Sequence, residues 1–256
     1  MSKRKTSAVH EESQFISNKR NKAFYQHESK TIDFSPIKVP RAPIKPVVMV
    51  PKSLNQEKYI IALLDPSIDI VVVSGPAGTG KTYLAIQAAI KALRSKQCSR
   101  IVLCRPKVAV EDEDHGFLPG SLEEKLAPWM RPMVDILHEY YSVKELDGML
   151  ADGTIEFSPL GLMRGRTFKD SIIILDEGQN AKPGQMKMLM TRLGIGSKII
   201  ITGDTDQTDQ KKTDNGLLDL TLKLKRHSPP GMAACEFELR DVQRHRIIEQ
   251  VLKLYS

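Results

Sequence analysis

The sequence has few cysteines, no paired metal-binding histidines and no long apolar run. Cys98, Cys104 and Cys235 are odd in number and lack the spacing of a metal site, so we expect reduced, packed thiols, as in a cytosolic protein. No segment approaches the ~20 apolar residues of a membrane span, and no apolar stretch follows the basic start. The sequence therefore predicts a cytoplasmic protein with no membrane partner and no secretory signal.

Positive charge is concentrated at one end of the chain. Residues 1–50 hold ten Lys or Arg and four Asp or Glu, whereas residues 51–256 hold 28 and 27. Residues 1–50 also contain scattered Ser and Gln and end in a proline-rich stretch. We interpret 1–50 as a basic, largely disordered or extended N-terminal arm, and 51–256 as one α/β domain. The arm fits an electrostatic tether for phosphates and a solubilising tail equally well.

A glycine-rich segment follows the first apolar run. Residues 70–73 are apolar and β-branched, residues 83–93 favour a helix, and the pattern G-x-x-x-x-G-K-[ST] lies between them. The glycines allow backbone N–H groups to point at phosphates, and the helix N-terminus adds its positive dipole end. Lys81 is predicted to reach the β- and γ-phosphates as a catalytic cation, and Thr82 to bind Mg²⁺. The predicted nucleotide-binding residues of this segment are Gly75, Pro76, Ala77, Gly78, Thr79, Gly80, Lys81, Thr82 and Tyr83.

Two adjacent carboxylates end a second apolar strand. Asp176 and Glu177 follow the apolar residues 172–175, about a hundred residues after the glycine-rich segment. Asp176 is predicted to hold hydrated Mg²⁺, and Glu177 to polarise an attacking water as general base. A nucleotide kinase usually lacks the second acid because its acceptor is not water. The pair therefore favours hydrolysis over phosphoryl transfer to another acceptor.

A third apolar strand, residues 198–202, runs into a polar turn. A polar group at its end would face the γ-phosphate from beside Asp176. Gln207 is the predicted catalytic sensor, because an amide both donates to phosphate and accepts from water. Gln179 can share this role, and a solvent-facing turn is the alternative interpretation of the segment that contains Gln207.

Together with several other blocks, these segments resemble the PhoH family. The similar blocks are residues 75–85, 116–120, 123–125, 127–132, 163–168, 175–177, 185–188, 191–194 and 241–245. The resemblance covers about residues 50–256 and implies a P-loop ATPase that uses ATP and Mg²⁺ in a bacterial or phage-infected cell. It also implies a link to RNA or single-stranded nucleic acid. Gln56 resembles the family's adenine-reading glutamine, and a polar residue at a helix N-terminus is the alternative interpretation.

The resemblance implies an α/β, RecA-like P-loop NTPase, in which a mostly parallel sheet is flanked by helices. Strands are expected near 70–74, 100–104, 155–159, 171–176, 198–203 and 234–239. Helices are expected near 81–95, 121–140, 184–193, 214–225 and 242–254, after a short helix around Gln56 and Tyr59. Pro183 suits the first turn of its helix. The site is expected at the carboxyl ends of the strands.

An arginine that stabilises the γ-phosphate is the remaining catalytic group. Arg244 resembles the first arginine motif beyond the helicase core and is the first candidate, with Arg192 second. Arg131, Arg164 and Arg166 are further candidates. A single motor domain has no following domain to supply this group. We therefore expect a homo-oligomer, such as a ring, in which one arginine acts in trans.

The segment after the second strand is expected to contact single-stranded nucleic acid. Arg105, Pro106 and Lys107 occupy the place of a strand-binding helicase motif. Phe117 and Trp129 can stack on bases or pack under the long central segment. The sequence thus predicts a Mg²⁺-dependent ATPase coupled to single-stranded RNA or DNA. The alternative is a slowly hydrolysing, ATP-switched module that regulates a protein partner.

Overall fold

The computed structural model describes residues 45–106, 122–207 and 214–243, with the backbone alone described over 122–129. Ile44–Ser256 form one compact unit. The expected helix over 242–254 lies outside the described residues, except for its first two positions. In the part of the chain that the structure describes, no helix combines the length and apolar character required to cross a bilayer.

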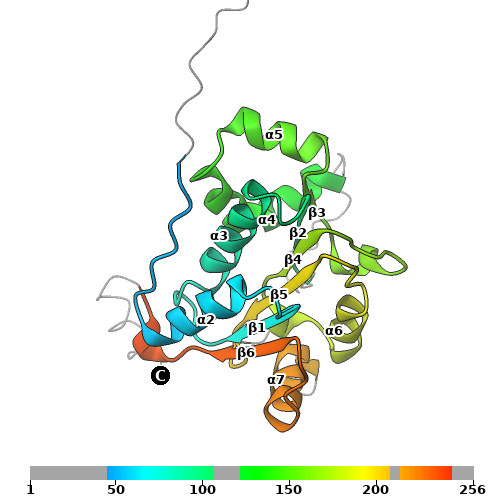
Figure 1. Ribbon diagram of the computed structural model, residues 1–256. Coiled ribbons are helices and arrows are strands. Elements are labelled where there is room, and N and C mark those ends of the chain that lie inside the picture. Colours follow the sequence, from blue (N-terminus) through cyan, green and yellow to red (C-terminus); the bar gives the residue numbers. More distant parts are fainter. Residues whose placement is uncertain (1–44, 107–121, 208–213, 244–256) are drawn as a thin grey trace, which may run out of the picture. The chain divides into compact units, whose positions relative to one another are not determined.

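Six parallel strands form the centre of this unit (Figure 1). They are β1 (Ile70–Ser74), β2 (Arg100–Cys104), β3 (Ile155–Phe157), β4 (Ser171–Leu175), β5 (Lys198–Gly203) and β6 (Met232–Glu236). Their order across the sheet is β3-β2-β4-β5-β1-β6, and every pairing is parallel. The predicted α/β fold with a parallel sheet is therefore confirmed. All carboxyl ends of these strands meet at one edge, where the loops gather.

Helices cover both faces of the sheet. They are α2 (Leu54–Leu64), α3 (Lys81–Arg94), α4 (Leu122–His138), α5 (Val143–Ala151), α6 (Pro183–Met190) and α7 (Gly216–Arg226). Apolar side chains of α2 to α5 share one core with Val71 and Val73, whereas those of α6 and α7 share another with Ile70 and Val72. This alternation along β1 is expected of a strand that is buried on both faces.

The predicted elements differ from the structure at a few places. β6 begins at Met232 and ends at Glu236, two to three residues before the expected span, because it pairs with β1 from Ile70↔Met232 to Ser74↔Glu236. Phe237 then leaves the strand, and its ring packs edge-on against Tyr59 at 5.6 Å. The helix α5 was not predicted, although its capping box at Ser142 and Glu145 is a recognised start signal.

Candidate nucleotide-binding site

The glycine-rich segment forms a loop between β1 and α3. Gly75, Gly78 and Gly80 have φ values of 143°, 83° and 83°, a region that residues with a Cβ rarely adopt. A Cβ on Gly75 would also lie 2.5 Å from the backbone oxygen of Phe237. The glycines are thus required by backbone conformation and by a close approach. The loop delivers the N-terminus of α3 to the carboxyl edge of the sheet, as the sequence predicts.

The Lys81 side chain crosses the inside of this loop. Its ammonium donates hydrogen bonds of 2.6 Å to the backbone oxygen of Gly75 and 2.8 Å to that of Pro76. The residue is buried, and the carbonyl oxygens compensate for the lost hydration of its charge. Lys81 therefore places a fixed positive charge inside the loop, where phosphate groups bind in loops of this type.

Two predicted metal-binding residues contact each other directly. Thr82 Oγ1 donates a 2.6 Å hydrogen bond to Asp176 Oδ1, and Thr202 Oγ1 on β5 donates one of 2.7 Å to the same oxygen. Asp176 and Thr202 are buried. A hydroxyl and a carboxylate are hard oxygen ligands, and Mg²⁺ usually needs only one or two carboxylates besides water and phosphate. The donor set at Thr82 and Asp176 therefore fits Mg²⁺.

Glu177 lies beside Asp176 in a constrained position. It precedes the short 3₁₀ helix η2 (Gly178–Asn180) with a left-handed φ of 56°. Its Oε1 accepts a 3.1 Å hydrogen bond from Arg105 Nη2, and its Oε2 accepts one of 2.6 Å from Gln179 Nε2. With 43% of its side chain exposed, Glu177 faces the solvent side of the site, as a residue that orients water should.

Of the two glutamines predicted near the γ-phosphate, Gln179 is the one that contacts Glu177. Gln179 is buried and also accepts a 3.1 Å hydrogen bond from the backbone N–H of Asp204, which follows β5. Gln207 is exposed on the turn after β5. The polar side chain of β5 that contacts Asp176 is Thr202, a residue that the sequence analysis did not single out.

Arg105 is a site residue whose position the sequence analysis did not foresee. Its Nε lies 3.3 Å from Asp176 Oδ2 and its Nη2 lies 3.1 Å from Glu177 Oε1. Its contact with nucleic acid stays a prediction, and in the structure the side chain pairs with the two acids. Cys104 is paired with Leu175 across β2 and β4, so the residues that follow these strands are neighbours. The sequence did contain a signal for this contact. Arg105 directly follows β2, and β2 adjoins the strand that ends before Asp176 and Glu177.

A pocket of about 470 Å³ adjoins the loop on the side of α2. It is lined by Val48, Val50, Lys52, Gln56, Gly78, Gly80, Tyr83, Leu84, Gln87 and Gln243. The Gln56 side chain is only 3% exposed, donates from Nε2 to the Thr79 oxygen at 3.0 Å, and accepts at Oε1 from the Lys52 N–H at 2.7 Å. Burial, together with hydrogen bonding to Tyr140 and Glu139, raises the pKa of the Tyr83 hydroxyl. The hydroxyl therefore stays neutral.

The C-terminal segment closes one side of this pocket. The backbone N–H of Gln243 donates a 2.9 Å hydrogen bond to the oxygen of Gly78 in the loop. Just before it, η4 (Leu239–Asp241) is tied to α2 by a 2.8 Å hydrogen bond from Asn55 Nδ2 to Asp241 Oδ2. Although burial opposes it, hydrogen bonding from Asn55 and Ser53 lowers the pKa of Asp241. Arg244 is the next residue in the sequence and lies outside the described residues.

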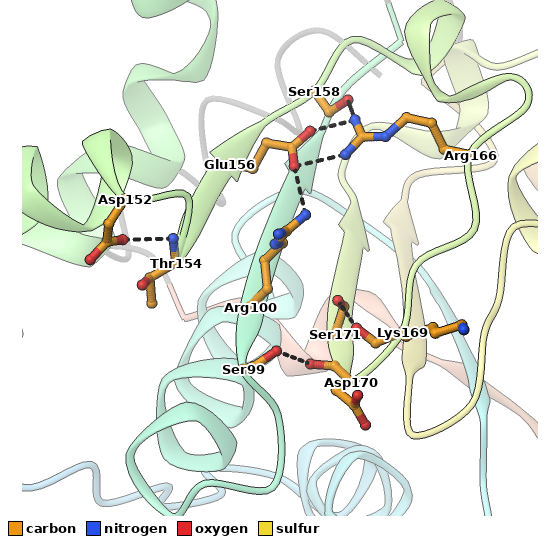
Figure 2. Close-up of polar contacts among 10 residues, drawn as sticks. All are labelled: Ser99, Arg100, Asp152, Thr154, Glu156, Ser158, Arg166, Lys169, Asp170 and Ser171. Carbon is orange, nitrogen blue, oxygen red and sulfur yellow. Dashed lines mark hydrogen bonds and ion pairs between the residues drawn. The ribbon is translucent and has the colours of Figure 1, made fainter.

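Three of the other candidate arginines, Arg131, Arg166 and Arg192, have partners within the chain. Arg192 Nη1 donates to the backbone oxygen of Arg166 at 3.2 Å, and Arg131 Nε lies 3.3 Å from Asp135. Arg166 forms a two-pronged contact with Glu156 on β3 (Figure 2). Phe117 and the Trp129 side chain, predicted to stack or pack, lie outside the described residues, as does Lys107.

These features define a P-loop protein with an ATPase-type nucleotide site. They are the parallel sheet, the glycine loop with Lys81 and the Asp-Glu pair after β4. The family model described as PhoH-like protein matches residues 48–256, and the chain belongs to this family. This confirms the family that the sequence resembles.

Curated relatives agree with the family assignment. The chain is 43% identical over 206 residues to a PhoH-like protein of Bacillus subtilis, covering 80% of this chain and 63% of that protein. It is 42% identical over 206 residues to a PhoH-like protein of Mycobacterium tuberculosis H37Rv (80% and 57%) and 37% identical over 193 residues to Protein PhoH of Escherichia coli K12 (74% and 54%). The chain thus spans between half and two thirds of the length of these relatives.

Solved structures of distant proteins show limited similarity. The large terminase of bacteriophage HK97 is 14% identical, with a TM-score of 0.44 and coverage of 78% of this chain and 41% of the terminase. The Pif1 helicase of Candida albicans is 14% identical, with a TM-score of 0.36 and coverage of 80% and 44%.

Proposed function

We propose that this chain is a Mg²⁺-dependent ATPase whose turnover is coupled to single-stranded RNA or DNA. The observation that carries the ATPase part is the convergence of Lys81, Thr82, Asp176 and Glu177 at the carboxyl edge of the sheet. An Asp-Glu pair beside a P-loop suits hydrolysis, since the first acid serves the metal and the second serves the water. Family membership supports the same proposal.

Each residue has a separate task in this proposal. Lys81 stabilises negative charge on the β- and γ-phosphates, and the loop N–H groups and the start of α3 add to it. Thr82 and Asp176 hold Mg²⁺, which neutralises phosphate charge when it is bound. Glu177 orients the attacking water and accepts its proton. Gln179 fixes one oxygen of Glu177 and so keeps the carboxylate in place.

The pocket beside the loop suits the adenine base. Gln56 uses one amide hydrogen and one lone pair of its oxygen within the protein, and an amide has two of each. The second hydrogen and second lone pair can bond to the N7 and N6 edge of adenine. Val48, Val50 and Leu84 supply apolar contact for the ring.

The nucleic-acid and oligomer parts rest on other grounds. A link to single-stranded nucleic acid is implied by the family resemblance, and the basic residues of 1–50 add attraction for phosphates.

A homo-oligomer would allow Arg244 to act on the nucleotide of a neighbouring copy. Because Gln243 bonds to the loop of its own chain, a role of Arg244 within one subunit is the alternative. Mixing inactive Lys81→Ala and Arg244→Ala proteins separates the two, because only a trans arginine restores activity in the mixture.

Phosphate release from ATP, with and without single-stranded RNA or DNA, tests the proposed coupling. We expect the strand to raise the rate and Lys81→Ala to abolish it. Lys91→Ala is the matched control, because Lys91 is an exposed lysine later on the same helix. Hydrolysis that is indifferent to either strand at low salt would contradict the coupling and leave a slow ATPase.

A slowly hydrolysing, ATP-switched module is the second candidate. Both oxygens of Glu177 are engaged by protein groups, which is the observation that favours slow turnover. Glu177→Gln distinguishes the candidates when binding to a protein partner or strand is measured in ATP. A switch is expected to remain in its bound state in this variant, whereas a motor loses its ATP-driven activity.

A further inference from the structure

Arg105 connects the two acids of the site. Its guanidinium lies within 3.3 Å of Asp176 Oδ2 and 3.1 Å of Glu177 Oε1. Gln179 holds the other oxygen of Glu177 at 2.6 Å. The residue expected to accept a proton from water is therefore bonded at both oxygens, one of them to a positive charge.

The position of Arg105 is fixed by the sheet. β2 lies next to β4, and the pairing of Cys104 with Leu175 places the ends of the two strands side by side. Only 14% of the Arg105 side chain is exposed. A guanidinium is planar and carries several donors, so it can span two carboxylates, whereas a lysine ammonium acts as a single point charge.

The two acids carry like charges on adjacent residues, so a nearby cation stabilises both. Arg105 supplies such a cation at Asp176, the same carboxylate that is expected to serve Mg²⁺. Two cations on one carboxylate repel each other, and this repulsion is only weakly screened in a mostly buried site. Arg105 and the metal ion therefore compete for the charge of Asp176. Glu177 must also release one oxygen before it can accept a proton from water.

We propose, building on the ATPase function above, that Arg105 is a positioning residue that restrains Glu177 and yields to the metal–nucleotide complex. While Arg105 holds both acids, Glu177 is kept from the water and the protein hydrolyses ATP slowly. Mg²⁺ bound with ATP would supply a second positive charge at Asp176, and the Arg105 guanidinium would then release Glu177. Arg105 thus sets the metal requirement of the reaction and limits turnover.

Removal of the guanidinium tests this role through two measurements. The first measurement is the affinity of the nucleotide-free protein for Mn²⁺, obtained from the EPR signal of free Mn²⁺. We expect Arg105→Gln to bind Mn²⁺ about tenfold more tightly than the unaltered protein. Half-maximal hydrolysis is expected at a Mg²⁺ concentration several-fold lower, with a kcat equal to or above that of the unaltered protein. Arg105→Lys keeps the charge but reaches only one acid, so its shift is expected to be smaller.

The control is Arg100→Gln at the opposite end of β2. Arg100 also pairs with a carboxylate, Glu156, at 3.5 Å (Figure 2), but it lies opposite Ser171 at the start of β4, whereas the two acids follow the end of β4. We expect Arg100→Gln to leave Mn²⁺ binding and the Mg²⁺ dependence of hydrolysis unchanged. Thermal melting of every variant shows whether the protein is folded, and the lysine variant keeps the test usable if Arg105→Gln does not fold.

Two results would overturn the inference. One is a fall in kcat at unchanged metal dependence, which would make Arg105 a cation that serves the reaction itself. The other is Mn²⁺ binding within twofold of the unaltered protein in both variants. If no form hydrolyses ATP, the ATPase proposal fails, and the Mn²⁺ titration still decides the role of Arg105.

Discussion

The hydroxyl of Thr82 lies 2.6 Å from Oδ1 of Asp176, to which it donates a hydrogen bond. The contact joins the first turn of α3 to the residue that follows β4, and the two residues are 94 positions apart in the sequence. The fold thus brings together the two side chains that the sequence assigns to Mg²⁺, and Thr202 and Arg105 also contact Asp176. The pair expected to hold Mg²⁺ therefore lies at the carboxyl edge of the sheet.

Replacement of Thr82 should act through the metal. In Thr82→Ala we expect kcat/KM for ATP to fall about 10- to 100-fold, because one oxygen ligand and a bond to Asp176 are lost. Thr82→Ser keeps the hydroxyl and is the control, with activity close to that of the unaltered protein. Hydrolysis rates over a Mg²⁺ titration check this, and a Thr82→Ala protein with unchanged Mg²⁺ dependence would exclude the assigned role.

Gln56 should determine preference for adenine. Gln56→Ala removes two hydrogen bonds to the base, so we expect the KM for ATP to rise about tenfold while that for GTP changes little. Gln97→Ala, an exposed glutamine just after α3, is the control. Competition of ATP and GTP for a fluorescent nucleotide measures the effect. Equal weakening for both bases would mean that Gln56 supports the loop, through its bond to Thr79, without contacting the base.

Two glycine substitutions should have opposite effects on stability. Gly75→Ala places a Cβ against the backbone of Phe237 and at a φ of 143°, so we expect a loss on the order of 3 kcal/mol. Gly148 lies within α5 with open space around its Cα, so Gly148→Ala should gain about 0.5–1 kcal/mol. Urea unfolding of both variants tests this contrast, which fails if Gly75→Ala is as stable as the unaltered protein.

Glu156 should contribute stability that depends on pH. Hydrogen bonding from Arg166 lowers the pKa of Glu156 (Figure 2). A carboxyl whose folded pKa lies below its unfolded value stabilises the protein above the unfolded value, near pH 4, and loses this contribution as pH falls through the folded value. Glu156→Gln should therefore cost about 1 kcal/mol at pH 7 and nearly nothing near pH 2.

The control for this prediction is Glu236, whose pair with Lys225 is exposed on both sides. Glu236→Gln should change the free energy of unfolding by less than about 0.5 kcal/mol at either pH. Denaturant titrations at the two pH values provide the comparison. A cost for Glu156→Gln that is the same at both values would show that packing, and not ionisation, is involved.

The central strands could be predicted from sequence because they are buried on both faces. β1, β4 and β5 are nearly continuous runs of Ile and Val, and a run of this kind fits a parallel sheet without reference to its neighbours. Their order in the sheet then places Lys81 and Asp176 at one edge. The local pattern of apolar and glycine residues was therefore sufficient to predict these strands and the glycine-rich loop.

Edge elements and cross-strand contacts could not be predicted in the same way. The bounds of β6 depend on its register with β1 and on the packing of Phe237 against Tyr59, which are distant in the sequence. The contact of Arg105 with Asp176 depends on the pairing of β2 with β4, two strands that are distant in the sequence. Residue type is visible in a sequence, but the direction of a long side chain is set by its neighbours in space.

The most direct test of the account is ATP hydrolysis by the Glu177→Gln variant, measured together with its binding of ATP. We expect near-normal ATP affinity and a rate at least about 100-fold below that of the unaltered protein, since the amide cannot take the proton of water. A variant that hydrolyses ATP at an unchanged rate would contradict the assignment of this carboxylate and, with it, the proposed mechanism.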